Sequence, residues 1–278
     1  MPTLADKNQI PHLLKLIDDP SPNVRSKVAE RLRIIGWTVW QEVDEQQLTL
    51  TDTQKQLLDS ILCAYDNATL TTAWRSWQRL SGETQKLDEA YALLADWQLG
   101  RGSGVRMRHQ LKALAGEFSD AGYMPHPKSL CHFLFNEKGL AGAVSEDYYN
   151  PLNSNLVYSL ESGFGIPITL ASIFILVGSR LGLEIHGCNF PGHFLARAHD
   201  GRREYIFDCF DGGRVLTGSE MFALRKAAPL EVHKPATAVE MIARVLRNMA
   251  SAYYHNGDNE KARYMLSLRS DLELIGNA

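Results

Sequence analysis

The stretch of sequence that decides the fold is residues 165–213, which read GIPITLASIFILVGSRLGLEIHGCNFPGHFLARAHDGRREYIFDCFDGG. Pro167 stands near its start, and proline is favoured at the first position of a helix because its fixed φ and missing N–H cost nothing there. Residues 168–178 are almost all apolar, which predicts a helix buried on most sides. Gly182 can cap that helix. The apolar run is about a dozen residues long, short of the roughly 20 that span a bilayer.

Two neighbouring strands are predicted after this helix. Residues 190–197 indicate a strand entered through a tight turn, and Asp200 with Gly201 is a hairpin signal. Residues 204–208 form the returning strand, because they are rich in aromatic and β-branched side chains. Antiparallel pairing would place His193 beside Asp208, so that the carboxylate orients the imidazole. The N-terminus of the preceding helix would add unpaired N–H groups and a positive dipole nearby.

The order of helix, strand with a histidine, hairpin and strand with an aspartate resembles the transglutaminase-like (papain-like) core. In that core a cysteine opens the helix, and the histidine and aspartate follow on successive strands. The sequence is more closely similar to the SirB-type family, the second transglutaminase-like core family. The motifs that carry this resemblance lie at residues 146–151, 153–154, 165–170, 180–183, 191–195 and 211–213. The resemblance implies an α+β fold in which a buried helix packs against an antiparallel sheet, flanked by α-helical N- and C-terminal segments.

The sequence departs from active transglutaminases at the nucleophile. Counted back from Gly182, the position of the catalytic cysteine falls at or near Pro167, and no cysteine lies between Cys131 and Cys188. The SirB-type family shows the same Gly-Ile-Pro signature, so the resemblance implies an inherited loss. His193 and Asp208 therefore fit two roles of a catalytic triad, and the thiol is missing.

Three alternatives remain for a nucleophile. The resemblance places Thr169 close to the lost thiol, where its hydroxyl could act as a Ser-type nucleophile beside an Asp-oriented histidine. The plainer reading, which we favour, is that this hydroxyl bonds a backbone carbonyl. His193 could instead act as a general base on water. Cys188 and Cys209 are expected to be structural, since strand alternation turns Cys209 away from the face of Asp208.

Candidate binding residues flank the predicted helix and strands. They are Asp147, Tyr148, Tyr149, Asn150 and Asn153 in the acidic and aromatic word before the helix, and Gly192, Asp211, Gly212 and Gly213 at the rim of a cleft. Two interpretations of the first group are weighed equally. Its side chains line a binding site, or they stabilise a loop through side-chain-to-backbone hydrogen bonds. Consecutive glycines allow positive φ and close approach, which suits a cleft rim.

The flanking sequence divides the chain into three predicted parts. Residues 1–128 read as an α-helical N-terminal region with a HEAT-like unit at 9–36, in which residues 18–22 break two apolar stripes. Within this region, residues 37–50 are expected to be irregular, and Trp74 and Trp77 to be core residues. The transglutaminase-like core is expected at 129–230. A tetratricopeptide-like helical hairpin follows at 238–271. A single repeat unit is more typical of packing than of an extended binding array.

Composition limits the partners. The net charge of −3 with no basic stripe excludes nucleic acid as an expected partner, and no membrane segment is expected. The first residues lack the pattern of a secretion signal, and the four cysteines form no CxxC pair, which predicts a cytoplasmic protein with reduced thiols. Nine histidines lack metal-ligand spacing, so no cofactor is predicted. The leading hypothesis is a binding, scaffold or regulatory protein with a protein or peptide partner. The alternative is an amide or ester hydrolase, or an acyl transferase, using His193 and Asp208 with Thr169 or water.

Overall fold

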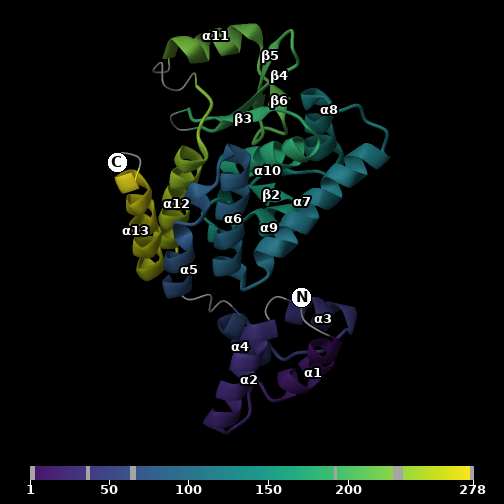
Figure 1. Cartoon of the computed structure of the whole chain (residues 1–278), viewed down its shortest axis with the longest axis vertical. Helices are drawn as coiled ribbons and strands as arrows, with labels where there is room; N and C mark the ends of the chain where they lie inside the picture. Colours follow the sequence, from purple (N-terminus) through teal and green to yellow (C-terminus); the bar gives the residue numbers. More distant parts are fainter. Residues whose placement is uncertain (1–3, 36–37, 63–66, 191–192, 228–233, 276–278) are drawn as a thin grey trace. The chain divides into compact units, whose positions relative to one another are not determined.

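The computed structural model describes residues 4–35, 38–62, 67–190, 193–227 and 234–275 (Figure 1). The chain divides into two compact units, each described here by itself. The first unit holds residues 1–73 and 92–106, and the second holds residues 74–91 and 107–278. Helix α6 (Glu83–Leu99) contributes to both units. None of the helices in the described ranges is long and apolar enough to cross a membrane.

The first unit is built from helices. They are α1 (Leu4–Lys15), α2 (Pro22–Ile35), α3 (Thr38–Glu45), α4 (Asp52–Leu62) and α5 (Asn67–Trp74), with the last part of α6 and the start of α7 (Ser103–Asp120). The two apolar stripes predicted on either side of residues 18–22 are buried in one core. Its members are Ile10, Leu14, Ile17, Val28, Leu32, Ile35, Val39, Val43, Leu58, Ile61 and Leu62.

Helix α3 corrects one expectation. Residues 37–50 were expected to be irregular, but Thr38–Glu45 is helical. Val39 and Val43 are spaced by four residues, which places both on one helical face, and both are buried in the core of the first unit. Three apolar residues in eight, Val39, Trp40 and Val43, are too short a pattern to reveal a helix from the sequence. Packing against the neighbouring helices therefore decides this segment.

The second unit is a mostly helical α+β fold with a small antiparallel sheet. Its further helical segments are α8 (Pro127–His132), α9 (Leu156–Ser162), α10 (Pro167–Arg180), α11 (Gly218–Ala227), α12 (Ala238–His255) and α13 (Asn259–Ile275), with short turns η1 (Trp77–Arg79), η2 (Phe133–Glu137), η3 (Ser145–Asp147) and η4 (Pro151–Ser154). Every residue of α10 from Ile168 to Gly178 is buried, which confirms the prediction from its apolar run.

The main sheet has the order β3-β4-β5-β6, and each neighbouring pair is antiparallel. The strands are β3 (Ile185–Cys188), β4 (Leu195–His199), β5 (Glu204–Asp208) and β6 (Arg214–Val215); β1 (Ala141–Gly142) and β2 (Phe164–Gly165) form a separate parallel pair. Helix α10 packs against β3 and β4, and Phe174 of α10 meets Phe207 of β5 with ring centroids 5.1 Å apart. The helix therefore supports the sheet from one side (Figure 1).

Strand β4 begins later than the sequence suggests. The strand was expected over residues 190–197, but it starts at Leu195. The backbone N–H of His193 donates to the carbonyl of Phe190 at 3.2 Å, so it is not used in pairing with a neighbouring strand. His193 therefore lies just outside the sheet, where its side chain can be reached by solvent. Pro191 and Gly192 lie outside the described residues.

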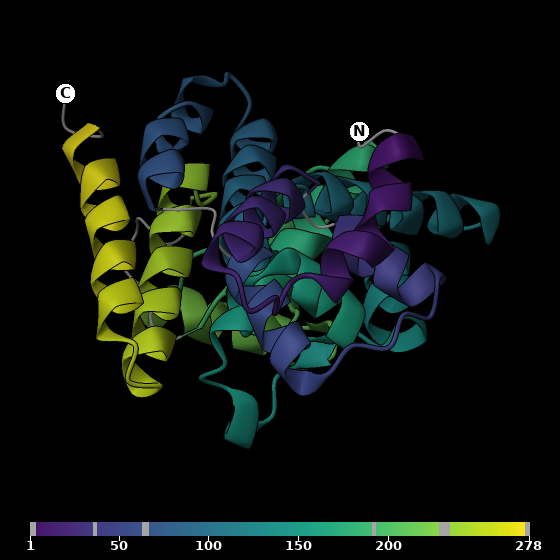
Figure 2. The same cartoon turned by 90° about the horizontal axis from the view of Figure 1, so that it is seen from below.

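Helices α12 and α13 pack as a hairpin, seen from two directions in Figures 1 and 2. Thr237 and Glu240 form a capping box that starts α12. Segments distant in sequence hold the hairpin in the second unit: the indole Nε1 of Trp74 donates to the carbonyl of Leu268 at 3.3 Å, and Glu83 accepts from the backbone N–H of Ala238 at 2.6 Å.

The two tryptophans near the start of the second unit are core residues. Trp74 and Trp77 are fully buried, and their rings meet edge to face with centroids 5.7 Å apart. This confirms the prediction from their spacing. The division into two units puts residues 107–128 and 238–271 with the sheet, whereas the three-part division at 1–128, 129–230 and 238–271 stays a prediction.

Candidate functional site

The candidate site is centred on a hydrogen-bonded pair at the end of the sheet. Nε2 of His193 lies 2.8 Å from Oδ2 of Asp208. The other carboxylate oxygen, Oδ1, accepts the backbone N–H groups of Phe210 and Asp211 at 3.2 and 3.1 Å. Because both oxygens of Asp208 are bonded, the carboxylate is held in one orientation. The His193 side chain is 37% exposed, whereas that of Asp208 is only 12% exposed. The histidine is therefore the accessible member of the pair.

The charge state of Asp208 follows from these contacts. Burial alone would raise the pKa of its carboxyl, but the hydrogen bond and positive charge of His193, with the two backbone N–H groups, outweigh burial and lower it. Asp208 is therefore ionised at neutral pH and can only accept hydrogen bonds. Nε2 of His193 then carries the proton of this bond. The other ring nitrogen, Nδ1, makes no hydrogen bond to the described residues.

An arginine from the C-terminal hairpin borders this pair, and the sequence analysis missed it. Nη1 of Arg244 on α12 donates to Oδ1 of Asn189 at 2.6 Å and to the carbonyl of Phe190 at 2.8 Å. The same carbonyl accepts the backbone N–H of His193. One signal was available: Arg244 stands among Ile242, Val245 and Leu246 of the buried helical stripe, and a charge at the edge of such a stripe must find a polar partner.

In the acidic and aromatic segment before α9, the asparagines and the tyrosines fit different interpretations. Asn153 is fully buried, and its amide donates to the carbonyls of Asp147 and Tyr148. Asn150 accepts from the N–H of Leu152 and so starts the turn at residues 151–154. These two asparagines therefore knit the loop. Their roles in binding stay predictions.

The two tyrosines of this word lie at the surface. Tyr148 is 39% exposed and meets the ring of Phe210 edge to face at 6.3 Å, so it stands beside the residue that follows the strand of Asp208. Tyr149 is 43% exposed and stacks on His255 of α12 at 4.2 Å. Of the pair, Tyr148 lies nearer to the candidate site. A binding role for either tyrosine is still a prediction.

The predicted rim at residues 211–213 is a turn between β5 and β6. Asp211 and Gly212 are exposed, and Asp211 pairs with Nε of Arg214 at 2.8 Å. Gly213 is buried and its carbonyl accepts from the thiol of Cys131. Gly192, the remaining rim candidate, lies outside the described residues. The turn holds the backbone N–H of Asp211 against Asp208, so its shape supports the pair.

The family is decided by a comparison with known proteins. The family model of the transglutaminase-like superfamily matches residues 106–247, which is half of the chain and includes the sheet, α10 and most of the site. The chain belongs to the transglutaminase-like superfamily. No solved structure matches it significantly.

Relatives of this transglutaminase-like chain come from bacteria and mammals. It is 37% identical to a UPF0162 protein of Xylella fastidiosa over 131 residues, covering 44% of this chain and 46% of the relative. It is 27% identical to a UPF0162 protein of Vibrio cholerae, covering 53% of this chain and 55% of the relative. It is 29% identical to F-box only protein 21 of Mus musculus, covering 46% of this chain and 21% of the relative. The chain thus spans about half the length of its UPF0162 relatives.

The described thiols of this transglutaminase-like protein are buried and protonated. Burial raises the pKa of Cys131 to about 12 and raises that of Cys209 well above its usual range. Burial also raises the pKa of Cys188, although the hydrogen bond from Arg197 partly offsets it. A neutral thiol is a poor nucleophile. Cys131, Cys188 and Cys209 are therefore structural in this arrangement, while Cys63 lies outside the described residues.

Thr169 lies in the first turn of α10, where the transglutaminase-like resemblance suggested a substitute nucleophile. Its side chain is fully buried, and no hydrogen bond among the described residues joins it to His193 or Asp208. Its hydroxyl lies near that of Tyr91 on α6, whose pKa burial raises strongly, partly offset by the hydroxyls of Ser172 and Thr169. The hydroxyl of Thr169 forms no hydrogen bond to a backbone carbonyl of the described residues, so the favoured interpretation was wrong on this point. Its role as a nucleophile stays an untested prediction.

Proposed function

We propose that this transglutaminase-like protein binds a protein or peptide and works without a thiol nucleophile. The observation that carries the proposal is the burial of Cys131, Cys188 and Cys209, with a raised pKa at each. Pro167 at the start of α10 supports it, because the resemblance places the nucleophilic cysteine there. We assign the chain to the SirB-type branch with a papain-like core. The HEAT-like unit at 9–36 and the tetratricopeptide-like unit at 238–271 are the proposed partner surfaces.

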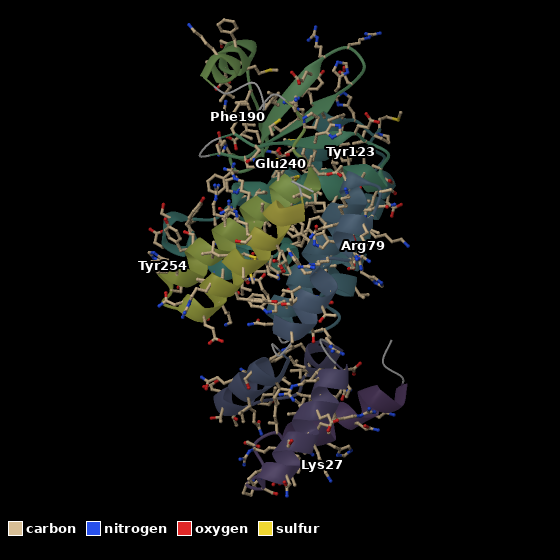
Figure 3. All side chains as sticks on the ribbon, turned by 60° about the vertical axis from the view of Figure 1, so that its left-hand side comes forward. Lys27, Arg79, Tyr123, Phe190, Glu240 and Tyr254 are labelled. Atoms are coloured by element: carbon tan, nitrogen blue, oxygen red, sulfur yellow. The ribbon has the colours of Figure 1, made fainter. Side chains whose placement is uncertain are left out.

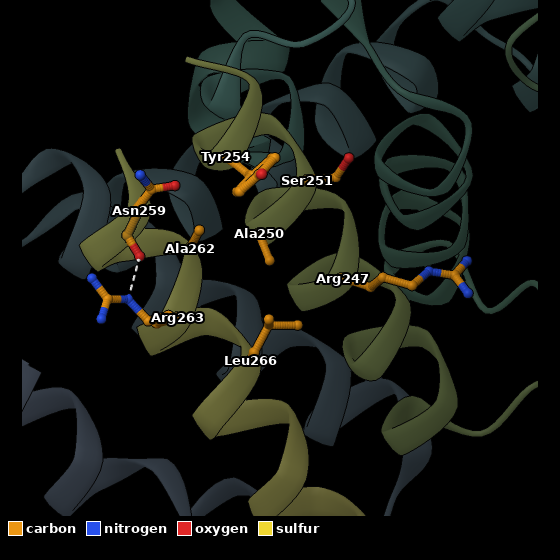
Figure 4. Close-up of a pocket in the computed structure, with 8 residues that line it drawn as sticks. All are labelled: Arg247, Ala250, Ser251, Tyr254, Asn259, Ala262, Arg263 and Leu266. Carbon is orange, nitrogen blue, oxygen red and sulfur yellow. Dashed lines mark hydrogen bonds between the residues drawn. The ribbon is translucent and has the colours of Figure 1, made fainter. Parts of the chain in front are cut away.

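The surface that best fits a peptide is the groove between α12 and α13 (Figure 4). Its volume is about 700 Å³, which suits one or two large side chains. Tyr254 is 71% exposed and Leu266 is 44% exposed, and both line the groove. In Figure 4 these side chains, with Ala250 and Ala262, meet between the two helices. Solvent exposure of such apolar groups is unfavourable, so an apolar side chain of a partner would be stabilised there.

Two arginines specify the charge of that partner. Arg247 and Arg263 line the edges of the groove, where Figure 4 shows their guanidinium groups extending outward, and neither forms an ion pair with the described residues. Nε of Arg263 donates to the carbonyl of Asn259, which leaves its charge uncompensated. Carboxylates are the natural partners of exposed guanidinium groups. The proposed occupant is therefore an acidic peptide segment of a partner protein that carries an apolar side chain.

A displayed library of random 12-residue peptides tests this function, selected on the wild-type protein and on Leu266→Glu. The matched control is Leu16→Glu, since Leu16 is 42% exposed and lies in the first unit, outside the groove. We expect acidic peptides with an apolar residue to be enriched on the wild type and on Leu16→Glu but lost on Leu266→Glu. The absence of enriched peptides, or their equal binding to Leu266→Glu, would overturn the proposed function.

The exposed His193–Asp208 pair favours a second candidate function, hydrolysis of an amide or ester or transfer of an acyl group. Nδ1 of His193 has no partner among the described residues, and an imidazole oriented by a carboxylate is the usual form of a general base. Water would be the nucleophile. This function predicts turnover of aryl esters or peptide anilides that His193→Ala abolishes and that iodoacetamide leaves unchanged. If neither protein shows turnover and both bind the selected peptides equally, the binding function stands alone.

A further inference from the structure

We infer that Arg244 is an anion-binding residue beside the His193–Asp208 pair and that its ligand is a carboxylate carried by a peptide. The inference rests on the proposed function in one respect, that the carrier is a peptide. It concerns a different surface from the groove between α12 and α13. Figure 3 labels Phe190, whose carbonyl accepts from Arg244, beside the sheet, and Tyr254 of the groove toward the far end of α12.

Arg244 carries a half-buried charge with neutral partners only. Nη1 donates to the amide oxygen of Asn189 and to the carbonyl of Phe190, and the guanidinium stands over the ring of Phe194 at 5.5 Å. No carboxylate among the described residues forms an ion pair with it. Burial and the charge of Arg247 lower its pKa, which shows that its surroundings oppose the charge. A buried charge without a counter-ion is costly, so a carboxylate ligand would be stabilised there.

The free edge of this guanidinium has the shape that a carboxylate needs. Nε and Nη2 point to the same side of the planar group and donate two parallel hydrogen bonds to one carboxylate. In Arg244 the described bonds use Nη1 alone. Those bonds fix the plane of the group and leave the Nε and Nη2 edge without a partner among the described residues. The side chain is thus held in position before any ligand arrives, which reduces the entropy lost on binding.

A chain of contacts connects Arg244 to the candidate site. The carbonyl of Phe190 accepts from both Arg244 and the backbone of His193, and His193 bonds Asp208. Asp208 accepts from the N–H of Phe210, whose ring meets that of Tyr148. A carboxylate on Arg244 therefore lies at the same surface as the exposed imidazole, and the rest of the peptide can pass over His193.

The test measures binding of three small probes to the full chain by NMR of the His193 imidazole. The probes are N-acetylglycine, which carries a C-terminal carboxylate, the α-amide of N-acetylglutamate, which carries a side-chain carboxylate, and the α-amide of N-acetylglutamine, which is its neutral counterpart. We expect at least one acid to shift the His193 signals and to bind about tenfold or more tightly than the neutral probe, as for a charge-assisted hydrogen bond. The acid that binds more tightly identifies the source of the carboxylate.

Substitutions at Arg244 and Arg263 show which arginine binds the acid probes. Arg244→Gln is expected to weaken the acids about tenfold, while Arg263→Gln, which removes the same charge from α13, leaves them unchanged. Arg244→Lys keeps the charge but loses the two-bond geometry and should fall between. Equal binding of acid and neutral probes, or wild-type affinity for acids in Arg244→Gln, would overturn the inference. If Arg244→Gln does not fold, the acid and neutral probes on the wild type and on Arg244→Lys decide it.

The two proposals fail separately. Leu266→Glu removes the groove that the peptide library tests and should leave the small acids bound at Arg244. Absence of enriched peptides on the wild type, with retained acid binding, would overturn the groove and keep the anion site. Enrichment on the wild type that Leu266→Glu abolishes, with equal binding of acid and neutral probes, would keep the groove and overturn the anion site.

Discussion

Gly213 offers a sharp test of how the turn after β5 supports the candidate site. Its φ is +74°, in the region that favours glycine, and an added Cβ would lie 2.5 Å from Sγ of Cys131 and 2.6 Å from the ring of Phe135. Its neighbour Gly212 also has positive φ, +58°, but a Cβ there would meet nothing within 4 Å. Alanine substitutions at Gly212 and Gly213 therefore separate two effects: strain of the backbone and a clash in the core.

The expected magnitudes follow from this difference. Gly212→Ala introduces only the backbone strain, about 1 to 2 kcal/mol of the free energy of unfolding. Gly213→Ala adds overpacking against Cys131 and Phe135, typically about 1 to 3 kcal/mol more. Neither contact can move away cheaply, because both side chains are buried. Gly213→Ala is therefore expected to be destabilised by about 2 to 5 kcal/mol.

Thermal unfolding of both variants, followed by circular dichroism, measures the two effects. Each kcal/mol lowers Tm by about 2 to 4 °C for a unit of this size. The decrease in Tm should be roughly twice as large for Gly213→Ala as for Gly212→Ala. Equal decreases for the two variants would refute the packing argument, because the variants differ only in the clash. A wild-type Tm for both would refute the strain argument as well.

Two further predictions concern the pair and the helix beside it. The folded-state pKa of Asp208 is lowered, so its ionised form stabilises the fold above the unfolded pKa of about 3.9, and this contribution is lost as pH falls through the folded pKa. The difference in Tm between wild type and Asp208→Asn should therefore be large at pH 7 and shrink below about pH 4; a constant difference would contradict it. Thr237→Ala removes the capping box of α12 and should cost about 1 kcal/mol, seen as a Tm lower by about 2 to 4 °C. An unchanged Tm would show that the contact of Glu83 with Ala238 suffices to hold the start of α12.

Local sequence patterns predicted the buried helix and the hairpin between the strands. The apolar run at residues 168–178 is long enough to require burial on all sides, and α10 is buried along that length. The strand order and the hairpin at Asp200 and Gly201 placed His193 near Asp208, since sheet pairing follows from short connections. Helix α3 was missed because two valines in one turn-and-a-half of helix match several structures equally well.

The site was only partly predictable because its remaining groups come from distant segments. Arg244 contacts Asn189 and Phe190, which precede it by more than 50 positions in the chain. No spacing rule connects such residues, and only tertiary packing brings them together. The side chain of Thr169 on α10 is buried near Tyr91 of α6. This burial depends on the position of α6, which the apolar pattern of α10 does not define.

The bond between Trp74 and Leu268 has a consequence for how the protein is made. The two residues are 194 positions apart, so the indole of Trp74 lacks this partner until residue 268 has been made. At about 5 to 20 residues per second, that interval is roughly 10 to 40 s. During this time the large aromatic side chain of Trp74 lacks its contact with α13. The second unit therefore completes this contact only after α13 has been made, and its nascent form is a natural client for chaperones.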